Sequence, residues 1–137
     1  MAKLTLDFEE DYDFDLIGIC SHIKDYRLSW ELNKLCEFDF IKTNDLEIKI
    51  KGDPQLFSFF SYIDEENHLE YYLINNRSEY GILIPEERKA DYFLLIKGFV
   101  MENHLQNLLT EIAQIKNILT TYTIQVEGLK SKSNLLF

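Results

Sequence analysis

The feature that most constrains the fold is a switch to two-residue alternation of apolar and polar side chains from residue 38 onward. In the stretch 46–51, Leu46, Ile48 and Ile50 point to one side of an extended chain, and the charged residues between them point to the other. We expect strands at 38–43, 46–51, 56–63, 69–75, 82–84 and 92–96, separated by turn residues at 43–45, 52–54, 64–67 and 75–78. The first two strands, and then the next two, are expected to form hairpins. Connections this short predict a mostly antiparallel sheet.

Other stretches repeat apolar residues every three to four positions, the period of a helix with one buried face. Residues 14–36 predict one bent helix or two short ones, whose single tryptophan, Trp30, is expected in the core. Residues 103–118 predict a second helix. Residues 120–127 are rich in β-branched side chains and predict a strand, although a continued helical heptad fits the same spacing. With a further short strand at 3–8, the order predicts an α+β domain: a mostly antiparallel sheet on which N-terminal helical segments and one C-terminal helix pack.

Length and charge narrow the class of protein. The chain has 137 residues and a formal net charge of −10. We expect one domain over residues 1–137, with a short tail at 128–137. Phosphate groups repel a chain this acidic, so we expect no binding to nucleic acid or to an anionic membrane. The sequence contains neither an apolar run of the ~20 residues that a membrane span needs nor the pattern of a secretion signal. We therefore expect a cytoplasmic protein.

Residue types that often hold metals are present, but their spacing fits no known kind of site. Cys20 and Cys36 match neither a redox pair nor a zinc site, so we expect two buried free thiols, with a disulfide as the alternative. Six carboxylates fall within residues 7–15 without the glycine and ligand spacing of a calcium loop. The favoured interpretation is a solvated loop, with Asp13 as a helix cap and Asp15 in the first turn. No metal and no cofactor is predicted.

The charged connector between two apolar runs, residues 85–91, is the candidate site. Pro85 ends the preceding strand because it has no N–H, and it suits the first position of a short helix. In a catalytic interpretation, Glu86 and Asp91 converge at the mouth of the connector as an acid/base pair beside Tyr92. The histidines offer no partner at an informative spacing, since they are scattered along the chain.

In a structural interpretation of the same connector, Asp91 accepts backbone hydrogen bonds and Glu86 pairs with Arg88 or Lys89. Turn chemistry then accounts for every residue without a substrate. We favour this interpretation, and with it a chain that is not an enzyme.

Residues 84–92, IPEERKADY, resemble the signature of the bacterial IPExxxVDY family, with Ala90 where the signature has valine. Residues 17–33 and 129–137 are also similar to that family, so the similarity spans nearly the whole chain. The resemblance implies a bacterial, intracellular, single-domain protein. It implies no activity, cofactor or catalytic residue.

The tail carries three large apolar residues, Leu135, Leu136 and Phe137, after a polar run. Such side chains gain free energy by leaving water, so we expect them to dock, either on the chain's own sheet or on a partner. The favoured function is a non-catalytic protein-interaction module or a small homodimer, with another protein or a second copy as partner. The alternative is a small-molecule-binding protein or an enzyme whose pocket lies at the connector.

Overall fold

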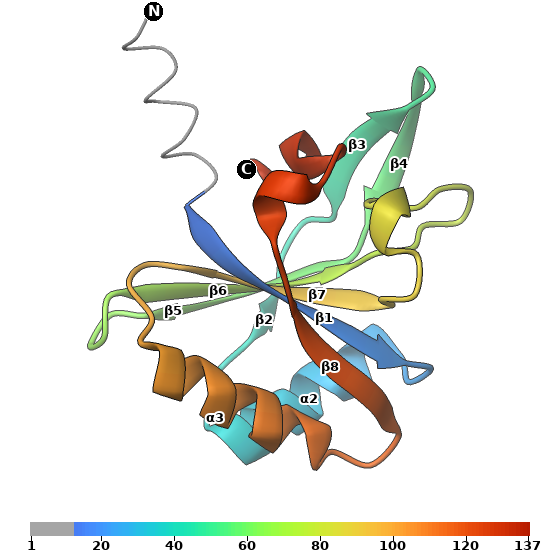
Figure 1. Cartoon of the computed structure of the whole chain (residues 1–137). Coiled ribbons are helices and arrows are strands. Elements are labelled where there is room, and N and C mark those ends of the chain that lie inside the picture. The colour runs from blue at the N-terminus through green and yellow to red at the C-terminus, as the bar shows by residue number, and fades with distance from the viewer. Residues whose placement is uncertain (1–12) are drawn as a thin grey trace, which may run out of the picture.

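The computed structural model describes residues 13–137 and confirms an α+β fold on a mostly antiparallel sheet (Figure 1). The main sheet has six strands in the order β2-β5-β6-β7-β1-β8, and β3 and β4 form a separate two-stranded sheet. The elements in chain order are β1 (Phe14–Ser21), α2 (Asp25–Cys36), β2 (Ile41–Lys42), β3 (Leu46–Ile50), β4 (Asp53–Phe57), β5 (Phe59–Asp64), β6 (Leu69–Asn75), the 3-10 turn η1 (Pro85–Glu87), β7 (Tyr92–Lys97), α3 (Glu102–Ala113), β8 (Ile118–Ile124), η2 (Val126–Gly128) and η3 (Lys132–Leu135).

The helix predicted over residues 14–36 is wrong in its first part, because Phe14–Ser21 forms β1. This strand lies between β7 and β8, and 6 of its 8 residues are buried. A strand with both faces buried carries apolar residues at nearly every position, so it also satisfies a helical spacing. The helix begins at Asp25, and from there to Cys36 the prediction is confirmed.

The hairpin predicted between residues 38–43 and 46–51 is also wrong. Only two residues of the first stretch form a strand, and this strand, β2, pairs with β5. β3 instead turns back onto β4 through Lys51 and Gly52, whose φ angles are 53° and 85°. Glycine adopts this left-handed geometry without steric cost, so the turn is tight and β4 begins at Asp53, inside the predicted turn 52–54. The second predicted hairpin is confirmed as β5 with β6, but the predicted strand 56–63 is divided, because Leu56 and Phe57 belong to β4.

The later elements agree with the sequence in type but not always in length. β7 and β8 are strands as predicted, so the heptad alternative for residues 120–127 is wrong. α3 ends at Ala113, five residues earlier than the predicted 118. Residues 82–84 form no strand, although Ile82 makes a single bridge to Arg77. The strand predicted at residues 3–8 lies outside the described residues.

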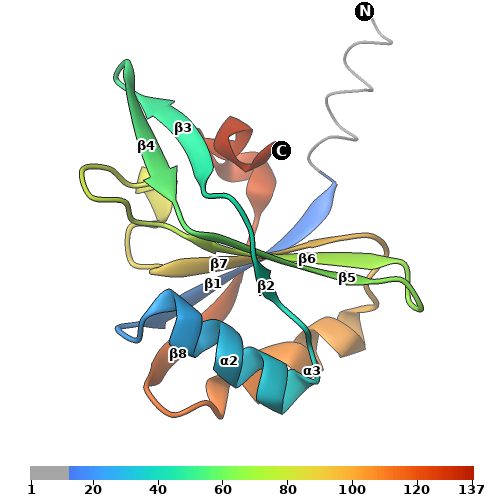
Figure 2. The same ribbon diagram turned by 180° about the vertical axis from the view of Figure 1, so that it is seen from behind.

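The two faces of the main sheet are covered by different kinds of structure (Figures 1 and 2). α2 and α3 cover the helical face, and the β3–β4 hairpin, η1, η2 and η3 cover what we call the loop face. Each face of the sheet has its own hydrophobic core, which we call the helical core and the loop core. Successive side chains of β7 point to opposite faces, so this strand contributes to both. Leu94 and Ile96 pack with the helical core, and Phe93 and Leu95 pack with the loop core.

Trp30 does not lie in the core as expected; its side chain is 50% exposed. Leu28 and Leu32 turn inward from α2, and Trp30, two positions from each, falls on the outer side of the helix. Arg27 and Lys34 place their charged groups 4.9 and 5.0 Å from the centre of its ring. The tryptophan is therefore held by cations at the surface rather than by packing.

Candidate functional site

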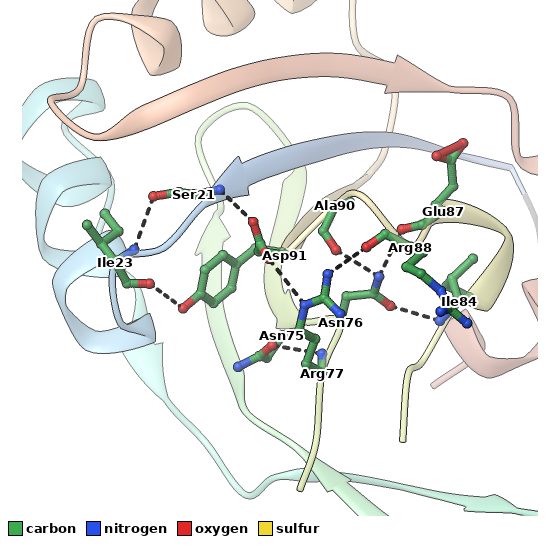
Figure 3. Close-up of polar contacts among 11 residues, drawn as sticks. Ser21, Ile23, Asn75, Asn76, Arg77, Ile84, Glu87, Arg88, Ala90 and Asp91 are labelled. Atoms are coloured by element: carbon green, nitrogen blue, oxygen red, sulfur yellow. Dashed lines mark hydrogen bonds and ion pairs between the residues drawn. The ribbon is translucent and has the colours of Figure 1, made fainter. Parts of the chain in front are cut away.

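Asn76 fixes the connector from inside the protein (Figure 3). The residue is fully buried, and its Nδ2 donates hydrogen bonds to the carbonyl oxygens of Glu87 (3.0 Å) and Ala90 (2.8 Å). Its Oδ1 accepts a hydrogen bond from the Ile84 N–H at 2.8 Å. One buried amide thus satisfies three backbone groups of a segment that forms no sheet ladder. The sequence around Asn76 indicates only a turn, and this role cannot be read from it, because only the fold brings residues 84–90 around the side chain.

Asp91, labelled in Figure 3, and its neighbour Tyr92 tie the connector to the end of β1. The Asp91 carboxylate accepts a hydrogen bond from the Ser21 N–H at 2.7 Å and one from Nε of Arg77 at 3.2 Å. The Tyr92 hydroxyl donates to the carbonyl oxygen of Ile23 at 2.7 Å, and burial raises its pKa to about 12. Both side chains therefore satisfy backbone groups where β1 leads into α2, as the structural interpretation of Asp91 proposed.

A shallow cavity of about 380 Å³ lies beside these two residues. Its lining residues are Ser21, His22, Ile23, Asn75, Arg77, Asp91 and Tyr92. Glu86 is not among them, so the structure does not gather the three candidate residues into one pocket.

Glu86 contacts the C-terminal segment instead of Arg88 or Lys89. Its carboxylate accepts hydrogen bonds from the N–H and from the hydroxyl of Ser131, both at 2.8 Å. The slight loss of hydration alone would raise the pKa of this exposed carboxyl, but the hydrogen bonds from Ser131 outweigh that effect and hold the pKa below its usual value. The expected ion pair with a neighbouring base is replaced by a contact 45 positions away in the sequence.

Glu87, which the sequence analysis did not single out, anchors β8 to the connector. Its carboxylate accepts a hydrogen bond from the Tyr122 hydroxyl at 3.0 Å, and Lys89 lies over the tyrosine ring at 4.4 Å from its centre. The ring lies against Gly18, where an added Cβ would come within 2.8 Å of it. The absence of a side chain at Gly18 therefore allows Tyr122 to cross β1 and reach the connector.

The three apolar tail residues lie against the chain's own loop face. Leu135 is fully buried in the loop core, and Leu136 is half-buried. Phe137 is 42% exposed and packs edge-on against Phe59 and Tyr72, with ring centres 4.8 and 5.1 Å away. Of the two docking sites that the sequence left open, this arrangement uses the chain's own sheet.

The free edge of β8 is the exposed feature that the sequence analysis did not identify. Among residues 13–137, β8 pairs only with β1 and ends the sheet, with its outer side toward the viewer in Figure 1. Its seven residues, ILTTYTI, contain no charge and no proline, and Leu119 is 66% exposed. An uncharged run of this length is visible in the sequence, but its edge position depends on the order of the strands.

Other candidate chemistry is sparse in the described part of the chain. Cys20 is buried, Cys36 is half-buried and both are free thiols; burial raises the pKa of each, to about 12 for Cys36. Within residues 13–137, no three His, Cys, Asp or Glu side chains are arranged to hold a metal ion. Most of the acidic run 7–15 lies outside that range. No helix among the same residues has the length and apolarity to cross a membrane.

Comparisons with protein-family models, with curated proteins and with solved structures give no match to this chain.

Proposed function

We propose that this protein is a non-catalytic interaction module that assembles with a second copy of itself through the free edge of β8. The observation that carries the proposal is an edge strand without a charge, a proline or a covering element among the described residues. Its pairing with β1 is in unbroken register from Thr120 to Ile124, and a single register shift lies near its start, at Leu119. Edge strands expose unpaired N–H and C=O groups, and monomeric proteins usually protect them with lysine, proline, bulges or very short strands. The opposite edge follows that rule, because β2 has only two residues and one of them is Lys42.

A two-fold axis at Thr121 would pair β8 with itself in an antiparallel manner. Leu119 of each copy would then lie opposite Thr123 of the other, so a threonine–leucine contact forms twice.

The flanking charges favour the same arrangement. Lys116 precedes the strand and Glu127 follows it, so an antiparallel pair brings the cation of one copy near the anion of the other.

The hydrogen bonds of the connector support a non-catalytic function. Asp91, Tyr92 and Glu86 each engage backbone groups of distant segments, which leaves them structural partners rather than a free acid/base pair. The resemblance of residues 84–92 to the IPExxxVDY signature, and the bacterial, cytoplasmic setting that it implies, are part of the same proposal.

The test is a charge swap across the proposed two-fold axis, read by sedimentation or by light scattering after gel filtration. In Leu119→Lys/Thr123→Lys, each lysine would face a lysine of the second copy, so we expect a monomer. In Leu119→Lys/Thr123→Glu, each lysine would face a glutamate, so we expect the dimer to persist at low salt and weaken at high salt.

Ile41→Lys is the matched control at the other edge, since Ile41 is 61% exposed on β2. We expect this variant to behave like the unchanged protein. The proposal is wrong if the unchanged protein is monomeric at the highest concentration that stays in solution, or if the lysine–lysine variant remains a dimer.

A further inference from the structure

A cavity of about 710 Å³ lies on the helical face of the sheet, at the end far from the connector. Its lining residues come mainly from the end of α2, the β5–β6 hairpin and the segment that leads into α3. The tip of the β5–β6 hairpin and the first turn of α3 lie at the left of Figure 1 and at the right of Figure 2. The residues that line it are Cys36, Glu37, Phe38, Tyr62, Asp64, Glu66, Asn67, Leu69, Tyr71, Phe99, Val100, Met101 and His104. A cavity of this size is typical of small-molecule sites.

The inner wall of the cavity consists of aromatic rings. Tyr62 and Tyr71 stack with ring centres 5.5 Å apart and planes inclined by 17°. Phe38 lies across both, 5.3 Å from Tyr62 and 4.6 Å from Tyr71. Tyr71 is only 1% exposed and belongs to the core beneath α2 and α3, so it backs the wall, and the half-buried rings of Phe38 and Tyr62 present its surface to the cavity.

The outer wall is apolar and exposed. Phe99 and Met101, in the loop between β7 and α3, are 87% and 61% exposed. These two large apolar side chains lie close together in the chain at the mouth of the cavity, where a ligand could cover them.

The charge at the cavity is negative. Glu37, Asp64 and Glu66 line it, and none of the described lining residues is Lys or Arg. The field of these acids acts on the aromatic wall. Burial and then Asp64, Asp39 and Glu66 raise the pKa of Tyr62, and burial with Asp64 raises that of Tyr71 to about 12.

We propose that this cavity binds a quaternary ammonium group, such as the trimethylammonium end of choline. The faces of aromatic rings attract cations that carry methyl groups, and a rim of carboxylates adds attraction without requiring the cation to donate hydrogen bonds. Three carboxylates would repel an anion, and a neutral apolar molecule would gain no attraction from them. This proposal does not depend on pairing at β8, because the cavity and the edge of β8 are different surfaces with no residue in common.

The test compares choline with 3,3-dimethyl-1-butanol, which has the same shape but a carbon atom in place of the charged nitrogen. Titrations of the full chain are followed by the amide NMR signals of residues 99–104. We expect choline to shift these signals and to bind about tenfold more tightly than the neutral alcohol, the ratio that a partly desolvated cation–π contact gives.

Two variants locate the binding. Phe99→Ala removes an exposed ring, so the fold should be unaffected, and Asp64→Asn removes one rim charge; each should weaken choline binding several-fold. Tyr80→Ala and Glu47→Gln are the matched controls, because both residues are exposed and lie outside the cavity, and neither should change binding.

Equal binding of the alcohol and choline would overturn the proposal, as would no shift with either, or a choline effect that survives both cavity variants. Once choline binding is found, phosphatidylcholine vesicles distinguish the source of the group. Sedimentation of the protein with the vesicles identifies a lipid headgroup, and its absence identifies a free molecule; both outcomes support the quaternary ammonium site.

Discussion

Each face of the sheet buries a hydrophobic core, but the segments that cover the helical face and the loop face are stabilised by different interactions. On the helical face, α2 and α3 satisfy most of their own backbone groups, and their contribution to the core is apolar side chains such as Leu28 and Leu108. On the loop face, the β3–β4 hairpin forms its own regular ladder, but the connector and the C-terminal segment cross the sheet with few regular hydrogen bonds.

Single polar side chains replace those missing bonds. Asn76 forms hydrogen bonds with the backbone of the connector, and Glu86 accepts a hydrogen bond from the Ser131 N–H. Asn134 donates from its Nδ2 to the carbonyl oxygen of Leu83 at 2.9 Å. A face covered by irregular chain therefore depends on a few side-chain hydrogen bonds, whereas a face covered by helices depends on apolar area. The following predictions test this difference, from the largest effect to the smallest.

Asn76→Ala should cost about 3 kcal/mol of unfolding free energy, because it leaves the buried Ile84 N–H and Ala90 carbonyl without partners and removes one of the two hydrogen bonds to the Glu87 carbonyl. The measurement is chemical denaturation. Ser29→Ala is the matched control, since Ser29 is also a buried polar residue but bonds only to the Tyr26 carbonyl within α2. The control should change stability by less than about 0.5 kcal/mol. Equal losses in the two variants would contradict the comparison.

Leu135→Ala should cost about 2 kcal/mol and should expose the tail to protease before the protein unfolds. The short segment can detach from the loop face, which limits the loss. Trypsin cleavage at Lys130 and Lys132, followed by mass spectrometry, reports this local opening. Leu32→Ala, in α2, removes an equally buried leucine. We expect it to cost about 3 kcal/mol without selective cleavage near the tail; selective cleavage there in both variants would remove the distinction.

Asp91→Ala should cost about 1–2 kcal/mol, since the Ser21 N–H and Arg77 lose their common acceptor. Asp91→Asn keeps an oxygen that can accept from Ser21, so it should recover about half of that loss. Thermal melts of the three proteins measure the series. A midpoint that is unchanged or raised in Asp91→Ala would indicate that Asp91 is kept for function rather than for structure.

Glu86→Gln should have the smallest effect, a fall in melting temperature of about 2 °C or less at neutral pH, because the contact with Ser131 is solvent-exposed. The pKa of Glu86 is lowered in the folded protein, so its carboxylate stabilises the fold above the usual pKa of 4.5. This contribution is lost as the pH falls through the lowered value. The two melting curves should therefore converge below about pH 4.5, and a difference that grows in acid would be inconsistent with this contact.

Local patterns identified the type of most segments that have one buried and one exposed face, although not always their ends. β5, β6, α3 and the tight turn that starts at Pro85 follow from alternation, helical spacing and the missing proline N–H. The prediction failed for β1, because a strand buried on both faces has no polar side to reveal its period. It also failed for the pairing of residues 38–51, because alternation identifies strands but not their partners.

The sequence by itself determined the fold class, most of the element types and the apolar character of the tail at 135–137, since these depend on local propensity and on the need to bury apolar surface. Only the tertiary structure decided that Glu86 meets Ser131 rather than its neighbouring bases, that Asn76 carries the connector, and that β8 ends the sheet. It also decided that four aromatic residues and three carboxylates from separate elements surround one cavity. The physical reason is the same in each case: hydrogen bonds and charge act over a few ångströms, and the residues that come within that range are separated by tens of positions along the chain.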